Sequence, residues 1–328
     1  MPPTKLTSGN FAGIDLGGTN MQLGVVALGS KGDDAKLIGE AKKKTKAEEG
    51  QEGVIGRIIE GLVEACAVAK ISIKDLAGVG IGAPGAVDPA DGIVLEAVNL
   101  RWKDVALASV LGKRLGVPVF LDNDVNVAVY GEYRLGAGRG CTDLLGVWVG
   151  TGIGGGLILK GELYYGHFMT SGEIGHTILF PNNPPGHRSL EHNCSRTAIV
   201  DRLIRLIESN RKSSLSKLVD GDLERIKSKS VGKAYEDKDP LTVEVVDDAA
   251  DMLGVAISNA VTLLSLPRVV LGGGFTEALG APFVERVQAN CRRFAFPDRC
   301  KKVVVVESEL MDHAGVFGAA MIARERVG

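Results

Sequence analysis

Two segments of the chain share a pattern that limits the folds it can adopt. Residues Phe11 to Leu28, "FAGIDLGGTNMQLGVVAL", and residues Leu144 to Leu163, "LLGVWVGTGIGGGLILKGEL", each predict two strands joined by a glycine turn. The two copies lie about 130 residues apart, which is much longer than the repeat of a solenoid protein. Each copy is followed by apolar strands that alternate with helices, a pattern typical of α/β sheets. The sequence therefore predicts a duplicated α/β domain, with a hairpin at the start of each half.

The remaining elements follow from the spacing of apolar residues. Short apolar runs predict strands in "LAGVGIGAPGAV", "VPVFL", "PRVVLGGGFTE" and "KVVVVESEL". Apolar residues at helical spacing predict helices at 54–69, 105–115, 195–208, 243–266 and 313–327. The helix at 243–266 is apolar on most faces, so we expect it to be buried between layers. Residues 209–240 are polar and carry charges of both signs, which predicts a surface excursion or a solvated helical pair without chemistry.

Composition excludes several classes of partner. The chain has 38 basic and 40 acidic residues, and its net charge of −2 gives no sign of a nucleic acid or an anionic membrane surface as partner. The five cysteines show no CxxC spacing. The absence of such pairs favours reduced thiols. The first ten residues contain no apolar leader segment, and no window is apolar enough to span a bilayer. We therefore expect a cytoplasmic protein, and its 328 residues favour two domains over one.

The two glycine turns are candidates for binding phosphate. Gly17, Gly18, Thr19 and Asn20 form the first turn, and Gly150, Thr151 and Gly152 form the second. A strand follows each turn, whereas a Walker A loop and a dinucleotide fingerprint both lead into a helix, so the pattern matches neither motif. Small residues leave backbone N–H groups uncovered, and such groups bind phosphate oxygens. Together with Gly273 and Gly274 of "GGGF", the turns predict a nucleotide site, although a tight turn also requires glycine for its shape alone.

Carboxylates stand at the ends of two predicted strands. Asp15 lies at the end of an apolar strand, where an unpaired buried carboxylate is costly. We expect it either to hold a hydrated Mg²⁺ that bridges phosphates or to cap the N–H groups of the turn. Asp122, Asn123 and Asp124 follow another strand and precede a helix. Helix capping explains one or two of these residues, and a third at the carboxyl end of a strand indicates ligand chemistry.

Six motifs together resemble one family. "GIDLGGTN", "GAPGAVD", "LDNDVNVAVYGE", "VGTGIGGGLIL", "SGEIGH" and "LGGG", in this order, resemble the ROK (repressor, open reading frame, kinase) sugar kinases. The resemblance extends from Phe11 to the C-terminus. It implies two RNase H-like domains of the actin and hexokinase type, with ATP and sugar in the cleft between them. We expect an N-terminal domain at 1–122, joined by the C-terminal helix 312–328, and a C-terminal domain at 123–311.

The resemblance also implies roles for individual residues. Asp124 matches the catalytic base and Asn123 a ligand of sugar hydroxyls, which leaves helix capping to Asp122. Carboxylates suit a sugar because each accepts hydrogen bonds from two neighbouring hydroxyls, and charge-assisted bonds are strong. Further sugar ligands are expected at Glu173, His176 and Glu191 and, by weaker matches, at Gly85 and Asn99.

The chain departs from the family at the site of a structural zinc ion. Family members carry a CxCGxxGC cluster before a Leu-Glu pair, but the corresponding positions here are Asn182, Pro184 and Ser189. We therefore expect no stoichiometric zinc. His187, His192 and Cys194 are an alternative set of metal ligands, although their spacing is not that of the family. The prolines of "FPNNPPG" offer another way to stiffen the loop.

The activity implied by the resemblance is transfer of a phosphate from ATP to a hexose, with Mg²⁺ as cofactor and a homodimer as assembly. "PGAVDP" and "DNDVNVA" favour the 6-hydroxyl of glucose as acceptor. N-acetylglucosamine, N-acetylmannosamine, mannose and fructose are alternatives. A sugar-sensing regulator would need a helix-turn-helix domain before the first glycine turn, where only ten residues precede Phe11. An ATPase of the actin or chaperone type would share the glycine hairpins but would not need "GEIGH".

Overall fold

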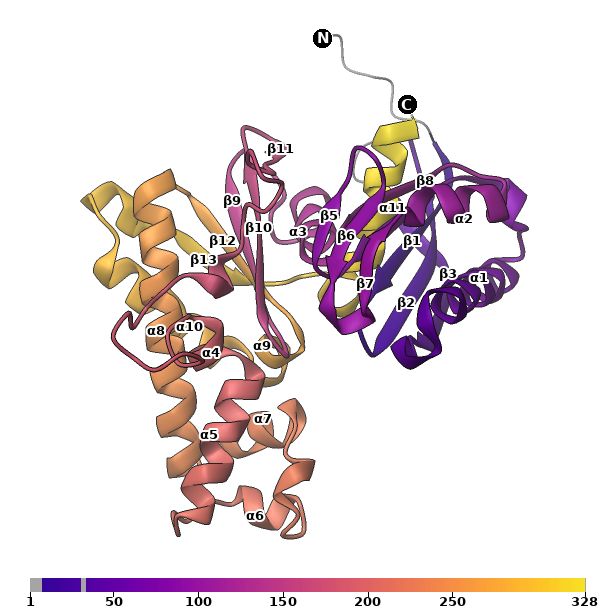
Figure 1. Cartoon of the computed structure of the whole chain (residues 1–328). Coiled ribbons are helices and arrows are strands. Elements are labelled where there is room, and N and C mark those ends of the chain that lie inside the picture. The colour runs from indigo at the N-terminus through magenta and orange to yellow at the C-terminus, as the bar shows by residue number, and fades with distance from the viewer. Residues whose placement is uncertain (1–7, 31–33, 328) are drawn as a thin grey trace. The chain divides into compact units, whose positions relative to one another are not determined.

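The computed structural model describes residues 8–30 and 34–327, which form two compact units (Figure 1). Unit 1 comprises Met1–Gly140, Leu163–Ser171 and Asp312–Gly328, and unit 2 comprises Cys141–Glu162 and Gly172–Met311. The expected boundary at residue 122 differs from this division, because the helix that follows packs on the C-terminal helix of unit 1. We expect the first ten residues to contain no leader segment, but most of them lie outside the described residues.

Unit 1 contains a five-stranded sheet with the order β3-β2-β1-β4-β8. The first three strands along the chain are antiparallel, whereas β4 and β8 run parallel to β1. The strands are β1 (Gly9–Leu16), β2 (Asn20–Leu28), β3 (Ala35–Lys44), β4 (Leu76–Ala83) and β8 (Val119–Asn123). A second, three-stranded sheet consists of β5 (Ala86–Asp88), β6 (Ile93–Ala97) and β7 (Trp102–Val105). Neither β3 nor the small sheet was predicted, because their residues lack a sustained apolar alternation.

Helices cover the sheet of unit 1 because each has a stripe of apolar side chains. They are α1 (Gly50–Ala69), α2 (Leu107–Leu115), α3 (Asp124–Leu135) and α11 (Ala314–Val327), with short 3₁₀ turns η1 (Ala47–Glu49), η2 (Ile73–Asp75), η3 (Val98–Leu100) and η7 (Met311–His313). In α1, Val54, Ile58 and Leu62 are fully buried at the spacing expected of one helix face. The helices predicted at 54–69, 105–115 and 313–327 are confirmed, with ends shifted by a few residues.

The C-terminal helix α11 packs closely on strands β1 and β4 and on α3 (Figure 1). Glycines at the crossing points permit this approach. A Cβ atom at Gly13 of β1 would overlap the carbonyl group of Val316, and one at Gly318 would overlap that of Val127 in α3. Small residues at these positions therefore hold α3, which follows β8, in a fixed place beside the sheet.

Unit 2 repeats the sheet of unit 1 in the order β11-β10-β9-β12-β13. A hairpin again leads the sheet and two parallel strands again follow, which confirms the predicted duplication. The strands are β9 (Leu144–Val149), β10 (Ile153–Leu159), β11 (Glu162–Leu163), β12 (Arg268–Gly272) and β13 (Val304–Glu307). The helices are α4 (Glu191–Cys194), α5 (Arg196–Glu208), α6 (Leu215–Leu218), α7 (Ser228–Glu236), α8 (Pro240–Leu264), α9 (Gly274–Leu279) and α10 (Ala281–Phe294), with 3₁₀ turns η4 (Ile174–His176), η5 (Leu223–Arg225) and η6 (Asp298–Lys302).

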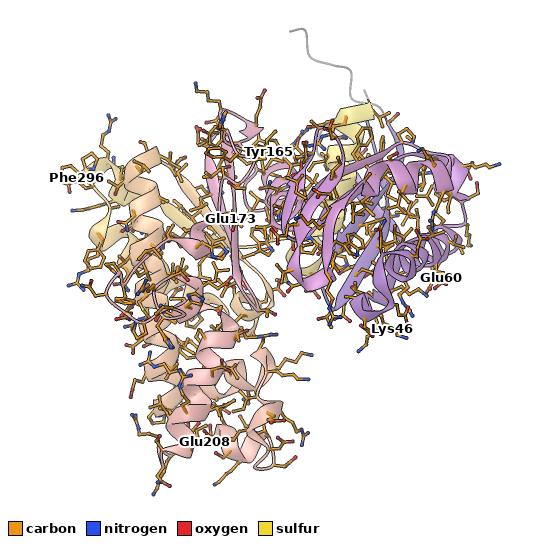
Figure 2. All side chains as sticks on the ribbon, in the orientation of Figure 1. Lys46, Glu60, Tyr165, Glu173, Glu208 and Phe296 are labelled. Atoms are coloured by element: carbon orange, nitrogen blue, oxygen red, sulfur yellow. The ribbon has the colours of Figure 1, made fainter. Side chains whose placement is uncertain are left out.

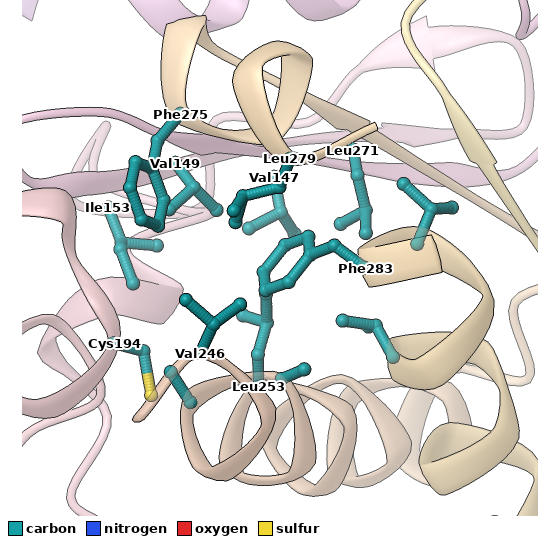
Figure 3. Packing of buried hydrophobic residues seen from close by; sticks show 14 of the residues in the cluster. Val147, Val149, Ile153, Cys194, Val246, Leu253, Leu271, Phe275, Leu279 and Phe283 are labelled. Carbon is teal, nitrogen blue, oxygen red and sulfur yellow. The ribbon is translucent and has the colours of Figure 1, made fainter. Parts of the chain in front are cut away.

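The core of unit 2 lies between its sheet and helices α8 to α10. Figure 3 shows Val147 and Leu271 of the sheet facing Leu253 of α8, with Phe283 of α10 between them. The long helix α8, which we expected to be buried between layers, is buried along one side only, and Leu263 near its end is 83% exposed. The buried apolar side chains thus pack α8 in the core of unit 2, whereas its last turn is in contact with solvent.

Residues 209–240 are more than a solvated excursion. They contain α6, η5 and α7, and the side chains of Leu215, Val231 and Ala234 are fully buried in the core of unit 2. The polar composition masks these few apolar anchors, which is why the sequence did not predict a contribution to the core. Among the described residues, no helix combines the length and the apolar character needed to cross a membrane. The five cysteines are free thiols, as expected.

Candidate active site

The carboxyl ends of three parallel strands place polar residues together in unit 1. Asp15 lies near the end of β1, Asn123 ends β8, and Asp124 begins α3. At the end of β4, Gly82 packs so closely that an added Cβ atom would lie 3.1 Å from the Cα atom of Asp124. The carboxyl ends of parallel strands are where α/β proteins bind their ligands.

The residue that caps α3 is Asn123. Its side-chain oxygen accepts the backbone N–H groups of Val125 at 2.9 Å and Asn126 at 3.1 Å. The prediction that Asp122 does the capping is wrong, because Asp122 is fully buried and pairs with Arg326 of α11 at 2.7 Å. Capping occupies the oxygen of Asn123, and its amide nitrogen donates to the carbonyl oxygen of Gly85 at 3.1 Å. An amide N–H of Asn123 is therefore the group that remains to contact a ligand.

Asp124 is a half-buried carboxylate at the first position of α3. Its Oδ1 atom accepts the backbone N–H group of Val125 at 2.9 Å. The N-terminus of a helix carries a partial positive charge, which favours the ionised form of a carboxylate. An ionised Asp124 is able to accept a proton, as a general base must.

Asp15 is a partly buried carboxylate among other acids. Burial, together with the nearby carboxylates of Asp124 and Asp312, raises its pKa to about 7. Among the described residues Asp15 has no hydrogen bond, so the alternative in which it caps the glycine turn is not observed. Asp312 precedes α11, and a Cβ atom at Gly315 would lie only 2.6 Å from Oδ2 of Asp15. The sequence did not predict Asp312, because only the packing of α11 brings it to this strand end.

The first glycine turn joins β1 and β2. The backbone N–H of Gly17 donates to the carbonyl oxygen of Asn20 at 3.0 Å. Thr45 is fully buried, and its hydroxyl donates to the carbonyl oxygen of Gly17 at 2.6 Å. Its backbone N–H donates to the carbonyl oxygen of Thr19 at 2.9 Å. Thr45 follows the unpredicted strand β3, so its role in fixing the turn had no signal in the sequence.

The two weaker sugar-ligand candidates lie along the same part of unit 1. Asn99 is exposed beside the first turn. A Cβ atom added at Gly18 would lie 2.9 Å from the Cβ atom of Asn99. Gly85 has a φ of 87°, and a Cβ atom there would lie 3.0 Å from the Cα atom of Ala97. The structure thus links Asn123, Gly85 and the segment that carries Asn99 through direct contacts.

The second glycine turn joins β9 and β10 in unit 2. The backbone N–H of Gly150 donates to the carbonyl oxygen of Gly152 at 2.9 Å, which closes the turn. The start of α5 holds it from outside, because the backbone N–H of Arg196 donates to the carbonyl oxygen of Gly150 at 3.0 Å. The Thr197 hydroxyl likewise donates to the carbonyl oxygen of Thr151 at 2.8 Å.

Arg196 is a cation at this turn that the sequence did not predict. Its guanidinium group donates to Oγ1 of Thr151 at 2.9 Å, and it forms no ion pair with any carboxylate in the described part of the chain. The neighbouring Ser195 caps α5, a pattern that reads as ordinary helix initiation in the sequence. An unpaired guanidinium at a glycine turn is suited to binding phosphate oxygens.

The third glycine segment lies beside the second turn, as a shared nucleotide site requires. A Cβ atom at Gly273 would lie 2.6 Å from the carbonyl oxygen of Val149, the residue before Gly150. Gly273 has a φ of 91°, which favours glycine, and Gly274 begins α9. A cavity of about 570 Å³ follows, bordered by Lys233 and Tyr235 of α7, by Leu279 at the end of α9 and by Gly280. Because α9 runs from Gly274 to this cavity, the cavity is a candidate for the base of a nucleotide.

The three main sugar-ligand candidates gather around the first half of β10. Oε2 of Glu191 accepts the backbone N–H of Ile153 at 2.8 Å. The exposed carboxylate of Glu173 lies 3.9 Å from Nε2 of the exposed His176. The η4 turn, which follows Glu173 and ends at His176, packs on β10, because a Cβ atom at Gly175 would overlap the carbonyl oxygen of Ile153. Unit 2 thus presents two carboxylates and an imidazole around one strand.

The loop before Glu191 is held by hydrogen bonds. Asn193 donates to the carbonyl oxygens of Ser189 at 2.7 Å and His187 at 3.2 Å, and Ser189 Oγ lies 2.8 Å from Nδ1 of His192. The alternative metal site at His187, His192 and Cys194 is not formed, because no group of three potential ligands assembles within the described ranges. Burial also raises the pKa of the Cys194 thiol to about 12, which disfavours a thiolate ligand.

Comparisons with known proteins agree with this geometry. The sequence profile of the ROK family matches residues 11–326. A glucokinase of Thermotoga maritima is 35% identical over 336 residues, covering 100% of both chains. A putative xylose repressor of a Caldicellulosiruptor species is 31% identical, and the match covers 94% of this chain and 77% of that protein. A ROK family glucokinase of Streptomyces griseus, solved with glucose and AMPPNP, is 29% identical with a TM-score of 0.84, covering 97% of this chain and 100% of that one.

These matches confirm the fold class expected from the sequence. The chain has the α/β fold of ROK kinases, which is the actin and hexokinase type of ATPase fold. The family profile spans nearly all of the described residues of both units, including the strand ends and glycine turns above. The chain therefore belongs to the ROK family.

Proposed function

We propose that this protein is a glucokinase that transfers the γ-phosphate of ATP to the 6-hydroxyl of glucose. The observation that carries the proposal is Asp124, a carboxylate at the start of α3 and the carboxyl end of β8, next to Asn123 and near Asp15. The full-length similarity to a protein named glucokinase supports the choice of glucose. The structure solved with glucose and AMPPNP supports a sugar and an adenine nucleotide as the two substrates.

In the proposed reaction Asp124 accepts the proton of the 6-hydroxyl group. The hydroxyl oxygen forms a bond to the γ-phosphorus, the bond from that phosphorus to the departing ADP oxygen breaks, and the products are glucose 6-phosphate and ADP. A positioned base contributes roughly 10²–10⁴-fold to such a step. Holding donor and acceptor in the reactive orientation contributes more, about 7–11 kcal/mol of the barrier.

In this proposal each unit carries residues that we assign to sugar binding. Glu191 uses Oε2 to accept the N–H of Ile153, so its other oxygen is free to accept from a hydroxyl group. Glu173 and His176 present exposed polar groups near the same strand, β10, and Asn123 offers an amide N–H. Gly85 and Asn99 complete the proposed contacts. A site with this many hydrogen-bonding groups rejects an analogue that lacks a hydroxyl, because a buried group is then left unpaired.

The nucleotide is bound by the glycine segments. We assign the phosphates to the N–H groups of Gly150, Thr151 and Gly152, with Arg196 beside them, and the adenine to the cavity next to Tyr235. Gly273 lies beside the second turn, and helix α9, which begins at Gly274, ends at the cavity. The first turn, Gly17 to Asn20, supplies further backbone N–H groups for phosphate oxygens.

Magnesium is the cofactor implied by this reaction class, and Asp15 fits it. Its carboxylate is partly buried and has two acidic neighbours, so a divalent cation nearby would favour its ionised form. We expect Asp15 to hold Mg²⁺ through water. When bound, the ion neutralises charge on the phosphates of ATP.

The assembly and compartment belong to the same proposal. Apolar side chains at the ends of α8 and α10 are exposed, among them Leu263 at 83% and Phe294 at 50%, which supports contact with a second copy of the chain. The free thiols support a reducing, cytoplasmic compartment, where the product would enter glycolysis. Light scattering on the purified protein tests the homodimer, and a monomeric mass would contradict it.

Two other functions remain as alternatives. A kinase for N-acetylglucosamine, N-acetylmannosamine, mannose or fructose would use the same base and the same glycine turns. A sugar-sensing regulator is suggested by the relative named putative xylose repressor, of which the match covers 77%. A regulator would need the sugar ligands but would not need a base at Asp124.

A coupled assay for ADP separates these functions. The purified protein is mixed with ATP, Mg²⁺ and one sugar at a time, with a sugar-free reaction as control. We expect ADP only when a sugar is present, and the highest kcat/KM for glucose. A higher kcat/KM for another hexose would reassign the substrate. Tight sugar binding without ADP would indicate a sensor, and ADP without sugar would indicate an ATPase.

A further inference from the structure

A buried cluster lies directly behind the proposed base. The carboxylate of Asp122 is fully buried and accepts four hydrogen bonds, from Tyr165 Oη at 2.6 Å, Arg326 Nη2 at 2.7 Å, the backbone N–H of Asn123 at 2.9 Å and Asn126 Nδ2 at 3.3 Å. Arg326 also donates to the carbonyl oxygen of Leu121 at 2.8 Å. The backbone that leads into Asn123 and Asp124 is therefore held by one carboxylate and its donors.

Tyr165 reaches this cluster from a different part of the chain. It lies in Leu163–Ser171, a short stretch that belongs to unit 1, although the residues on both sides of it belong to unit 2 (Figure 2). The Tyr165 ring is largely buried, and burial raises the pKa of its hydroxyl, as does the neighbouring Asp122. The hydroxyl therefore stays protonated and donates to the Asp122 carboxylate.

The same stretch leads to a proposed sugar ligand. The backbone N–H of Ser171 donates to the carbonyl oxygen of Tyr165 at 3.1 Å, and the Ser171 hydroxyl bonds to the carbonyl oxygen of Tyr164. The stretch is thus a closed loop whose two ends are Tyr165 and Ser171. Glu173 follows Ser171 by two residues. Fixing Tyr165 therefore limits the positions that the chain entering Glu173 can adopt.

We propose that Tyr165 is a positioning residue for two of the chain segments that carry proposed sugar ligands. Through Asp122 it orients the Asn123–Asp124 turn, and through the 165–171 loop it orients Glu173. This inference rests on the glucokinase proposed above and adds a residue that none of the motifs contains. The tyrosine does not touch the reacting atoms; it acts through Asp122 and through the backbone of its loop.

The test is the variant Tyr165→Phe, which removes one hydroxyl and keeps the ring. Tyr164→Phe is the matched control, because Tyr164 is 49% exposed and its hydroxyl has no hydrogen bond to any described residue. We expect Tyr165→Phe to lower kcat and raise the KM for glucose, each by about tenfold, since small misplacements of reacting groups are costly. The KM for ATP should change less than twofold. An unchanged kcat and glucose KM, or a loss of thermal stability alone, would overturn the proposal.

A second measurement keeps the test independent of the proposed activity. Hydrogen–deuterium exchange of the substrate-free protein reports whether the Tyr165 hydroxyl holds its loop. We expect faster exchange across residues 166–176 in Tyr165→Phe and no change in Tyr164→Phe. Equal exchange in all three proteins would overturn the proposal even if the enzyme is active. If the wild type phosphorylates no sugar, the proposed function fails. Faster exchange in Tyr165→Phe would still show that the Tyr165 hydroxyl holds its loop.

Discussion

At the scale of single residues, the helix-capping role expected of Asp122 passes to Asn123. Both side chains are good helix caps, so the sequence cannot choose between them. Asn123 caps α3 because Asp122 is already paired with Arg326, 204 positions further along the chain. The base candidate Asp124 is unaffected by this change of role, since it occupies the first helical position in either case.

Replacing Asp124 by Asn tests the base at this scale. The amide cannot accept the proton of a hydroxyl group, so we expect kcat to fall by about 10²–10⁴-fold. Binding of glucose and ATP, measured by calorimetry, should persist because the shape of the site is kept. Asp91→Asn, at an exposed aspartate in the same unit, is the control and should retain full activity. Near-normal turnover in Asp124→Asn would mean that another group is the base.

Arg196 allows a second residue-scale prediction. Its guanidinium lies at the second glycine turn without a carboxylate partner, so we expect Arg196→Gln to raise the KM for ATP by about tenfold. The KM for glucose should change little in steady-state kinetics. Arg205→Gln is the matched control, because Arg205 is exposed on the same helix α5 and away from the turn. An ATP KM equal to that of the wild type would remove Arg196 from the phosphate site.

At the scale of elements, glycines decide how closely helices approach the sheets. The C-terminal helix α11 crosses α3 where Gly318 meets the backbone of Val127. The sequence predicts α11 from its apolar residues but not the element on which it packs. The position of α3, and with it that of Asp124, depends on this crossing.

Gly318→Ala should therefore destabilise unit 1. The new Cβ atom would overlap the carbonyl group of Val127, and overpacking of this kind costs about 1–3 kcal/mol. Denaturant unfolding measures the loss. Gly56→Ala in α1 is the control, because an added Cβ atom there meets nothing within 4 Å and alanine favours a helix by up to about 1 kcal/mol. Equal unfolding midpoints for the wild type and Gly318→Ala would contradict the close packing.

The loop before Glu191 carries a prediction about metal. Hydrogen bonds from Asn193 and a bridge between Ile178 and Ser189 hold this loop. We expect elemental analysis of the purified protein to find no stoichiometric zinc. Treatment with a chelator, followed by return of Mg²⁺, should leave both activity and melting temperature unchanged. One zinc ion per chain would show that a metal holds the loop after all.

At the scale of the whole molecule, the two units carry different parts of the proposed chemistry. The proposed base Asp124 and Asp15 are in unit 1, whereas Glu173, His176, Glu191 and the cavity proposed for the nucleotide are in unit 2. Each unit uses the same sheet order, and in each the functional groups cluster at the glycine turn and the strand ends. The repeated sheet topology thus places one set of proposed substrate-binding residues in each unit.

Binding of glucose should stabilise the whole molecule if it is the substrate. A ligand that binds only the folded state at 100 times its Kd contributes about 2.7 kcal/mol. We therefore expect D-glucose to raise the melting temperature by roughly 3–5 °C in a thermal unfolding experiment. L-glucose at equal concentration is the control for solvent effects. Equal melting temperatures with both enantiomers would count against glucose as the ligand.

Much of this protein follows from its sequence alone. The two hairpins, the main helices, the duplication and the positions of Asp15, Asn123 and Asp124 at strand ends were all predicted. These features depend on apolar spacing and turn residues, which act over a few neighbouring positions. The strand β3 and the buried residues of 209–240 were missed, because polar residues surround their few apolar anchors.

Tertiary structure alone decided which distant residues meet. The pairing of Asp122 with Arg326 and Tyr165, the approach of Asp312 to Asp15 and the contact of Arg196 with Thr151 join positions far apart in the chain. No local pattern specifies these partners, because they depend on how helices α5 and α11 pack against the sheets. The local sequence thus selects the elements, whereas packing selects the charges that surround the proposed base and phosphates.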